Sequence, residues 1–218
     1  MAKGMPDEVA PQRTISRLSL YRGLLQDLCK AGTKNVFSHD LAVLARFTSA
    51  QVRRDFMSIG YSGSPQKGYD VGGLLESIEV FLDPPKCQPV ALVGVGNLGR
   101  AILAFFRGRR PKLTIEASFD IDPGNVGRVI HGCRCHPVEL LTEIVGAMGI
   151  RVAILAVPAA AAQDVADRLV RAGVRGILNF APRRLHVPPG VWVEDIDMTA
   201  SLEKVAYFAR RNVDRERV

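Results

Sequence analysis

The feature that most constrains this chain is a set of three glycines between an apolar run and a helical run. Residues 90–93 are apolar, residues 94–99 read Gly-Val-Gly-Asn-Leu-Gly, and residues 101–106 form an apolar helical run. In a strand–loop–helix unit the first glycine allows a tight turn, the second lets the backbone approach a pyrophosphate, and the third lets the helix pack closely on the strand. The helix N-terminus also favours a bound anion. The pattern predicts a dinucleotide-binding loop that contains Gly94, Gly96, Asn97, Leu98 and Gly99.

An acidic pair follows the next predicted strand, residues 113–119, which ends in Asp120-Ile121-Asp122. Asp120 lies 21 positions after Gly99, close to the spacing of about 20 expected for a carboxylate that binds the adenosine ribose. Such a carboxylate repels a 2′-phosphate, so NAD(H) is favoured over NADP(H) as the cofactor. Asp122 either shares this role or caps the turn that follows.

The second half of the chain alternates predicted strands and helices. Further strands are expected at residues 152–157, 177–181 and 191–196, with a helix at 159–172. This alternation is typical of a doubly wound parallel sheet, an α/β fold. A last helix, roughly residues 199–211, carries a strongly apolar set and is expected to dock on its own domain or on another subunit.

A proline pair divides the chain near residue 85. Asp83-Pro84-Pro85-Lys86 can continue neither a helix nor a central strand. We therefore expect a first domain at residues 1–85, a second at 86–198 and a separate C-terminal helix at 199–218. Residues 1–67 hold ten Lys or Arg against five Asp or Glu, a net charge of +5, whereas residues 68–218 hold 19 against 17. This bias suggests a polyanion-binding module at the N-terminal end, although a solvated basic face would look the same.

The first domain carries a helix-turn-helix pattern. An amphipathic helix is expected from about residue 15 to 28, a short second helix capped by Ser38, and a third capped by Ser49. Val52 and Phe56 are assigned to the buried face of the third helix. Four polar residues are assigned elsewhere around it: Gln51, Arg53, Arg54 and Asp55.

The donors of that third helix suit DNA. Gln51, Arg53 and Arg54 lie near its N-terminal end, where a recognition helix needs groups that reach base edges or phosphates. Adjacent arginines are often only solvated surface, but here they coincide with the basic bias. The turn-rich residues 60–70 are expected to form a β-hairpin wing that carries Lys67.

Composition excludes several classes of protein. Apolar residues make up 47% and charged residues 23%, as in ordinary folded domains. No apolar run reaches the roughly 18 residues that a membrane span needs, so a cytoplasmic protein without membrane contact is expected. The cysteines are Cys29, Cys87, Cys133 and Cys135. A metal site with His131 and His136 is conceivable, but these ligands would all come from six neighbouring residues, so plain thiols and no metal are expected.

Several segments together resemble the Rex family of bacterial redox-sensing transcriptional repressors. The matching stretches are 49–56 (SAQVRRDF), 90–100 (VALVGVGNLGR), 119–123 (FDIDP), 154–158 (ILAVP), 176–182 (GILNFAP) and 193–197 (VEDID). The resemblance implies a homodimer whose subunits join an N-terminal winged helix to a C-terminal Rossmann domain and exchange their last helices. It also implies that the dimer binds an inverted-repeat operator when free or NAD⁺-bound, and leaves the DNA when NADH binds.

The resemblance also assigns site residues. The glycine loop would bind the pyrophosphate, and Asp120 and Asp122 would face the adenosine ribose. The nicotinamide side would be formed by Val157, Pro158, Asn179 and Phe180, with Asp197 near its end. The recognition helix would present Ser49, Gln51, Arg53 and Arg54, and the wing Lys67.

Two positions depart from the family's usual pattern. Phe105 stands where members often carry a tyrosine, and Ser64-Pro65-Gln66 stands where the wing usually carries Lys-Arg-Gly. An NAD-dependent dehydrogenase is the main alternative function, with His186 as its best acid–base candidate. Residues 86–198 are nearly all used by the Rossmann fold, which leaves no room for a substrate domain, so no catalytic residue is expected. A nucleotide-binding module similar to those of CoA ligases is a third possibility, disfavoured by the helix-turn-helix.

Overall fold

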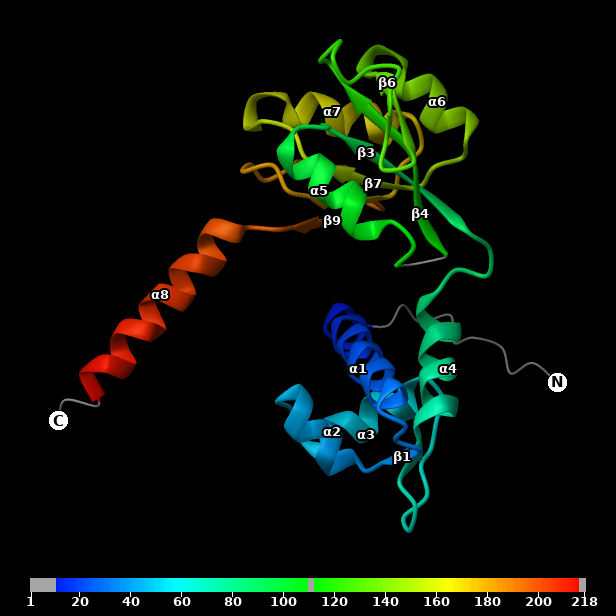
Figure 1. Cartoon of the computed structure of the whole chain (residues 1–218), viewed down its shortest axis with the longest axis vertical. Coiled ribbons are helices and arrows are strands. Elements are labelled where there is room, and N and C mark those ends of the chain that lie inside the picture. Colours follow the sequence, from blue (N-terminus) through cyan, green and yellow to red (C-terminus); the bar gives the residue numbers. More distant parts are fainter. Residues whose placement is uncertain (1–10, 110–111, 216–218) are drawn as a thin grey trace. The chain divides into compact units, whose positions relative to one another are not determined.

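The structure is a computed structural model that describes residues 11–109 and 112–215. Residues 1–10 of the expected first domain and residues 216–218 of the expected C-terminal segment lie outside these described residues. The chain divides into two compact units, with the division between Pro85 and Lys86 (Figure 1).

The first unit is a helical domain with one short ribbon. Helices α2 and α3 are joined by a tight turn and pack with α1 and α4 around one apolar core, so the predicted helix-turn-helix is present. Strands β1 and β2 pair antiparallel. The sequence pattern did not predict β1, which is only two residues long. The elements are α1 (Gln12–Lys30), β1 (Asn35–Val36), α2 (Ser38–Ala45), α3 (Ser49–Ser58), β2 (Tyr69–Asp70) and α4 (Val71–Leu82).

Both helix caps lie one residue earlier than predicted. Phe37 is the N-cap of α2 and supplies no side-chain cap. Thr48 is the N-cap of α3, and its hydroxyl accepts a hydrogen bond from the backbone N–H of Gln51. The assignments to Ser38 and Ser49 were therefore wrong. Thr48 has the extended backbone that a cap requires, whereas Ser49 is already helical.

The predicted wing is shorter than a full hairpin. Ser64 and Gly68 exchange two backbone hydrogen bonds of 2.7 Å, which close a tight loop with the exposed Lys67 near its tip. The chain then enters β2, which pairs with β1 rather than with the other arm of the loop.

The second unit contains a seven-stranded sheet in the order β5-β6-β4-β3-β7-β8-β9. Every neighbouring pair is parallel except β5 with β6. The strands are β3 (Gln88–Val93), β4 (Leu113–Asp120), β5 (Val129–Ile130), β6 (Cys133–Pro137), β7 (Val152–Leu155), β8 (Gly176–Asn179) and β9 (Trp192–Asp195). The order reverses next to β3, the first strand, as it does in dinucleotide-binding folds. The predicted doubly wound sheet is therefore confirmed.

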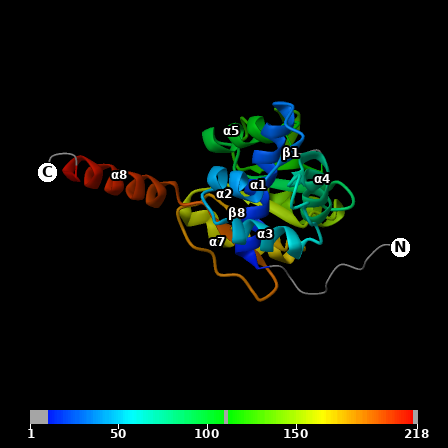
Figure 2. The same cartoon turned by 90° about the horizontal axis from the view of Figure 1, so that it is seen from below.

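Helices cover both faces of this sheet (Figures 1 and 2). Along β3, Val90 and Leu92 share a core with α5, and Ala91 and Val93 share another with α6 and α7. This alternation follows from the two-residue period of a strand, and it explains why the run is continuously apolar. The helices are α5 (Asn97–Phe106), the 3-10 turn η1 (Val138–Leu140), α6 (Leu141–Ala147), α7 (Ala159–Arg171) and α8 (Met198–Arg215).

The β5–β6 hairpin and α6 were not predicted. His131 and Gly132 form its two-residue turn, both with positive φ (49° and 87°), between the paired Ile130 and Cys133. Such a turn suits the twist of a hairpin. Cys133 and Cys135 on β6 point into the core beside α5. Among the described residues, no group of three or more His, Cys, Asp or Glu could hold a metal ion.

The last helix, α8, carries an apolar set that this chain leaves uncovered. Leu202, Val205 and Phe208 are 70%, 66% and 59% exposed. No helix in the described part of the chain, α8 included, is both long and apolar enough to cross a membrane.

Candidate sites: a glycine-loop cleft and an exposed basic helix

Glycine is needed at each position of the loop for a different physical reason. Gly94 has φ of +93°, and a Cβ on it would collide with the carbonyl oxygen of Ala156. A Cβ on Gly99 would collide with the carbonyl oxygen of Gly94, because α5 lies directly against the loop. At Gly96, by contrast, a Cβ would meet nothing within 4 Å. Gly94 and Gly99 therefore shape the loop, whereas Gly96 leaves open space beside its backbone.

A cleft of about 490 Å³ opens at the carboxyl ends of β3, β4 and β7. This is the edge of a doubly wound sheet where ligands bind. Its lining includes eight of the predicted cofactor residues: Gly94, Gly96, Asn97, Leu98, Asp120, Asp122, Val157 and Pro158. The cleft does not include Gly99, Asn179, Phe180 or Asp197.

The cleft fits a phosphorylated ligand at the start of α5. Gly96 is the N-cap and offers no side-chain acceptor, and the first turn carries no acidic residue. Backbone N–H groups at an uncapped helix N-terminus attract anions through hydrogen bonding and the helix dipole. Together with the open space at Gly96, this end of the helix suits a pyrophosphate.

Asp120 holds the loop rather than pointing freely into the cleft. One carboxylate oxygen accepts hydrogen bonds from the backbone N–H groups of Ile121 (2.7 Å) and Asp122 (3.0 Å). The other accepts from Val95 N–H (2.7 Å) and Asn125 Nδ2 (3.1 Å). Burial by itself raises the pKa of Asp120, but these hydrogen bonds outweigh it and the pKa lies below its ordinary value. A carboxylate has about four acceptor positions, and protein donors occupy four here.

Asp122 is the more available carboxylate at the rim. It is exposed, and one of its oxygens accepts a hydrogen bond from Gly124 N–H at 2.8 Å. Asn125, which the sequence analysis missed, is 5% exposed and bridges Asp120 to the carbonyl of Val95. Arg100 on α5 donates to its side-chain oxygen. An asparagine after Pro-Gly resembles any turn residue, so no sequence signal marked it.

The remaining predicted cofactor residues have structural contacts of their own. Asn179 is 1% exposed and its Nδ2 donates to Asp195 (2.7 Å) and to the carbonyl of Arg183 (2.8 Å). Asp197 accepts from Ala200 N–H at 2.8 Å and so caps the start of α8. Phe180 packs partly buried beside α5's core.

His186 lies on an exposed loop outside the cleft. Its backbone N–H and carbonyl are both bonded to the side chain of Gln163. This position offers no acid or base to a ligand at the glycine loop.

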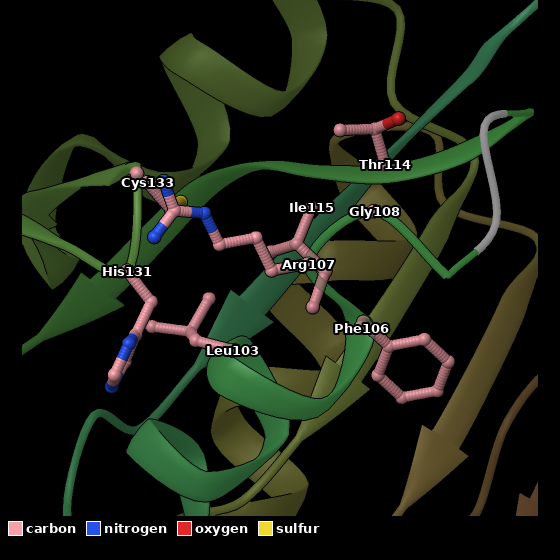
Figure 3. Close-up of a pocket in the computed structure, with 9 residues that line it drawn as sticks. Leu103, Phe106, Arg107, Gly108, Thr114, Ile115, His131 and Cys133 are labelled. Atoms are coloured by element: carbon pink, nitrogen blue, oxygen red, sulfur yellow. The ribbon is translucent and has the colours of Figure 1, made fainter.

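A second, smaller cavity of about 270 Å³ lies between the end of α5, the start of β4 and the β5–β6 turn. Figure 3 shows the side chain of Arg107 extending toward Cys133, and Leu103 and Phe106 also line the cavity. None of the predicted site residues lines this cavity.

The exposed face of α3 carries the predicted DNA-contacting residues. Arg53 and Arg54 are exposed, Gln51 and Ser49 are half-buried. Arg53 donates to the hydroxyl of Ser38 on α2 (3.1 Å), and Arg54 donates to Gln51 Oε1 (3.0 Å). The prediction was wrong for Asp55, which was assigned away from the buried face but is only 3% exposed. It is buried because α1 supplies partners for its charge.

Two family descriptions match separate parts of the chain. "CoA binding domain" matches residues 86–183, and "Putative DNA-binding protein N-terminus" matches residues 10–56. The two matches correspond to the sheet-containing unit and to the helix-turn-helix.

Curated relatives match nearly the whole chain. The redox-sensing transcriptional repressor Rex of Roseiflexus sp. (strain RS-1) is 41% identical over 210 residues, 96% of each chain. The protein of the same name from Anoxybacillus flavithermus is 42% identical over 92% of this chain and 94% of its own. The solved structure of RSP, a Rex-family repressor, in complex with β-NAD⁺ and operator DNA is 30% identical with a TM-score of 0.86, over 97% of each chain. RSP in complex with β-NADH gives the same identity and TM-score. The chain therefore belongs to the Rex family of redox-sensing transcriptional repressors.

Proposed function

We propose that this chain is a homodimeric repressor that binds an inverted-repeat operator when it is free or NAD⁺-bound, and releases it when NADH binds. One observation carries the proposal: this chain has both an exposed basic helix-turn-helix and a glycine-loop cleft that fits a dinucleotide. RSP, which aligns with nearly the whole chain, has been solved with β-NAD⁺ and operator DNA and with β-NADH.

In this proposal α3 enters the major groove. Ser49, Gln51, Arg53 and Arg54 lie on or near its exposed side, and Arg and Gln side chains are the usual readers of guanine and adenine edges. Lys67 supplies one cation at the tip of a short wing, which suits a phosphate contact rather than base reading.

The cofactor would lie across the carboxyl ends of the strands. The uncapped start of α5 holds the pyrophosphate, and Val157 and Pro158 after β7 flank the nicotinamide side. Asn179 is the last residue of β8, Phe180 follows it, and Asp197 lies two residues after β9. Asn179 orients that edge through its bond to Asp195. Of the two acidic residues, Asp122 binds the ribose hydroxyls directly, while Asp120 holds the loop that both depend on.

The dimer is supported by α8. Its exposed apolar side chains need a cover, and exchange of this helix between subunits would provide one. The functional divisions of the chain in this proposal are residues 1–85 for DNA, 86–198 for the cofactor and 199–218 for the exchanged helix.

The switch requires that the two cofactor forms stabilise different dimer arrangements. NAD⁺ and NADH differ by one hydride and one charge at the nicotinamide ring. Phe105 near the end of α5 has no hydroxyl to donate, and its ring instead lies 4.1 Å from the guanidinium carbon of Arg109. A hydrogen bond from a tyrosine hydroxyl is therefore not available to the switch at this position.

Fluorescence anisotropy on a labelled, AT-rich inverted repeat from upstream of the protein's own gene tests the proposal. Salt is held constant, because phosphate contacts make affinity strongly salt-dependent. Tight binding that NADH reverses and NAD⁺ does not is the expected result. The double variant Arg53→Ala, Arg54→Ala should lose the DNA and keep NADH binding. DNA binding that ignores NADH would overturn the sensor, and hydride transfer to a carbonyl substrate would favour a dehydrogenase.

A further inference from the structure

Asp55 lies at the centre of a partly buried hydrogen-bond network between α1 and α3. Arg17 on α1 donates to both of its oxygens, from Nε at 2.6 Å and from Nη2 at 2.7 Å. The hydroxyl of Tyr21, also on α1, donates at 3.1 Å. The fourth donor is Gln51 Nε2, one turn earlier on α3, at 2.8 Å.

This network decides which end of the Gln51 side chain faces outward. A carboxylate only accepts hydrogen bonds, so the amide nitrogen of Gln51 must face Asp55. Its oxygen therefore faces away, and there it accepts from Arg54 Nη2 at 3.0 Å. The chain of contacts runs from a residue of α1 through Asp55 and Gln51 to a guanidinium on the surface.

The consequence is that Arg54 is held before DNA arrives. A side chain already fixed in one rotamer loses less conformational entropy on binding, and a guanidinium reads a base only when its donors are correctly aimed. Arg53 is held differently, by the hydroxyl of Ser38 on α2. The two neighbouring arginines thus depend on separate supports.

We propose that Asp55 is a positioning residue for base recognition: held by Arg17, it orients Gln51, and Gln51 in turn orients Arg54. This inference rests on the proposed role of α3 in DNA binding. Asp55 itself is too deeply buried to touch DNA, so its effect on base discrimination passes through Gln51.

A double-mutant cycle on base discrimination tests the proposal. Affinity is measured for the operator duplex and for the same duplex with single base pairs exchanged. The readout is the discrimination ratio, the affinity for the operator divided by the affinity for the exchanged duplex. Asp55→Asn keeps the size of the side chain but can present a donor to Gln51, so the ratio should fall about tenfold in the wild-type background. In the Gln51→Ala background the same change should leave the ratio within twofold, because the path is already broken.

Tyr21→Phe is the matched control. It removes one donor to Asp55 but leaves the oxygen that Gln51 contacts, so stability should fall while the ratio stays the same. If Asp55→Asn reduces the ratio equally in both backgrounds, Asp55 acts only through the fold and the inference is wrong.

A second cycle, Gln51→Ala with Arg54→Ala, decides the matter if Asp55→Asn does not fold. The Arg54→Ala single variant identifies the base pair that Arg54 reads. At that base pair the inference requires that the double variant loses no more discrimination than Arg54→Ala alone, and multiplicative losses there would overturn it. A wild-type protein that binds no operator duplex at all would refute the proposed function instead, so the two failures are distinguishable.

Discussion

Asp55 and Asp120 are two carboxylates that accept the same number of hydrogen bonds from different kinds of donor. Each accepts four hydrogen bonds, and the pKa of each is lowered although burial alone would raise it. The donors to Asp55 are all side chains, from Arg17, Tyr21 and Gln51. Three of the four donors to Asp120 are backbone N–H groups.

This difference in donors distinguishes the cofactor cleft from the DNA-reading helix. A site held by backbone groups depends on the path of the loop and tolerates changes of an exposed side chain that donates nothing, such as that of Ile121. A site held by side chains depends on the identity of each of them. The cofactor cleft should therefore be sensitive to backbone changes, and the DNA-reading helix to side-chain changes.

The largest effect should come from breaking the backbone path. Gly99→Ala places a Cβ against the carbonyl oxygen of Gly94, which the adjoining strand and helix cannot easily avoid. We expect a loss of about 3 kcal/mol in the stability of the second unit, measured by urea unfolding with the fluorescence of Trp192, the only tryptophan of the chain.

Gly96→Ala is the matched control for this change. Its Cβ meets no protein atom within 4 Å and its φ of −69° suits alanine. Stability should be unchanged while NADH affinity falls at least tenfold, because the methyl group occupies the space beside the pyrophosphate. Equal unfolding in both variants would refute the separate roles assigned to these glycines.

The corresponding side-chain change is Arg17→Leu. It removes two donors and the one positive partner that the described residues supply to a carboxylate that is 3% exposed. Breaking a buried ion pair from one side costs about 3 kcal/mol, which amide hydrogen exchange across α3 would detect.

Asn125→Ala is its counterpart in the second unit. Three backbone donors to Asp120 remain, so the loss should be about 1 kcal/mol. If Asn125→Ala lost more stability than Arg17→Leu, the conclusion that Asp120 depends less on side chains than Asp55 would be wrong.

Acid should weaken both units by the same mechanism. A carboxylate whose pKa is lower in the folded state adds stability that is fully present above its unfolded pKa of about 4 and is lost as pH falls through the folded value. The stability difference between wild type and Asp55→Asn should therefore shrink below about pH 4, as should that for Asp120→Asn. Urea unfolding from pH 7 to pH 3 measures both, and a difference that stays constant over this range would contradict the assignment.

The smallest effect concerns the wing. Lys67 is exposed and offers one charge, so Lys67→Ala should weaken binding to specific and non-specific duplexes alike and lower the salt slope by about 1. Titrations at several salt concentrations give this slope. A loss of base discrimination would instead mean that the wing reads sequence.

The same contrast explains what could be predicted from the sequence. Gly94, Gly96 and Gly99 carry a backbone requirement in their own identity, and with the apolar runs they were enough to predict the sheet and its cleft. The bond between Arg17 and Asp55 joins residues 38 positions apart, and no local pattern marks it. A motif records a residue's position and not its partners, so the sequence predicted Asp120 at the cleft but not the four hydrogen bonds that hold it there.

The two cysteines of β6 have a consequence for the kind of chemical signal the protein can receive. Cys133 and Cys135 are 3% and 0% exposed, and burial raises the pKa of both thiols. Peroxides and alkylating agents attack accessible thiolates, so they reach the exposed Cys29 and Cys87 first. Peroxide is therefore expected to react at Cys29 and Cys87 before it modifies the two buried thiols of β6.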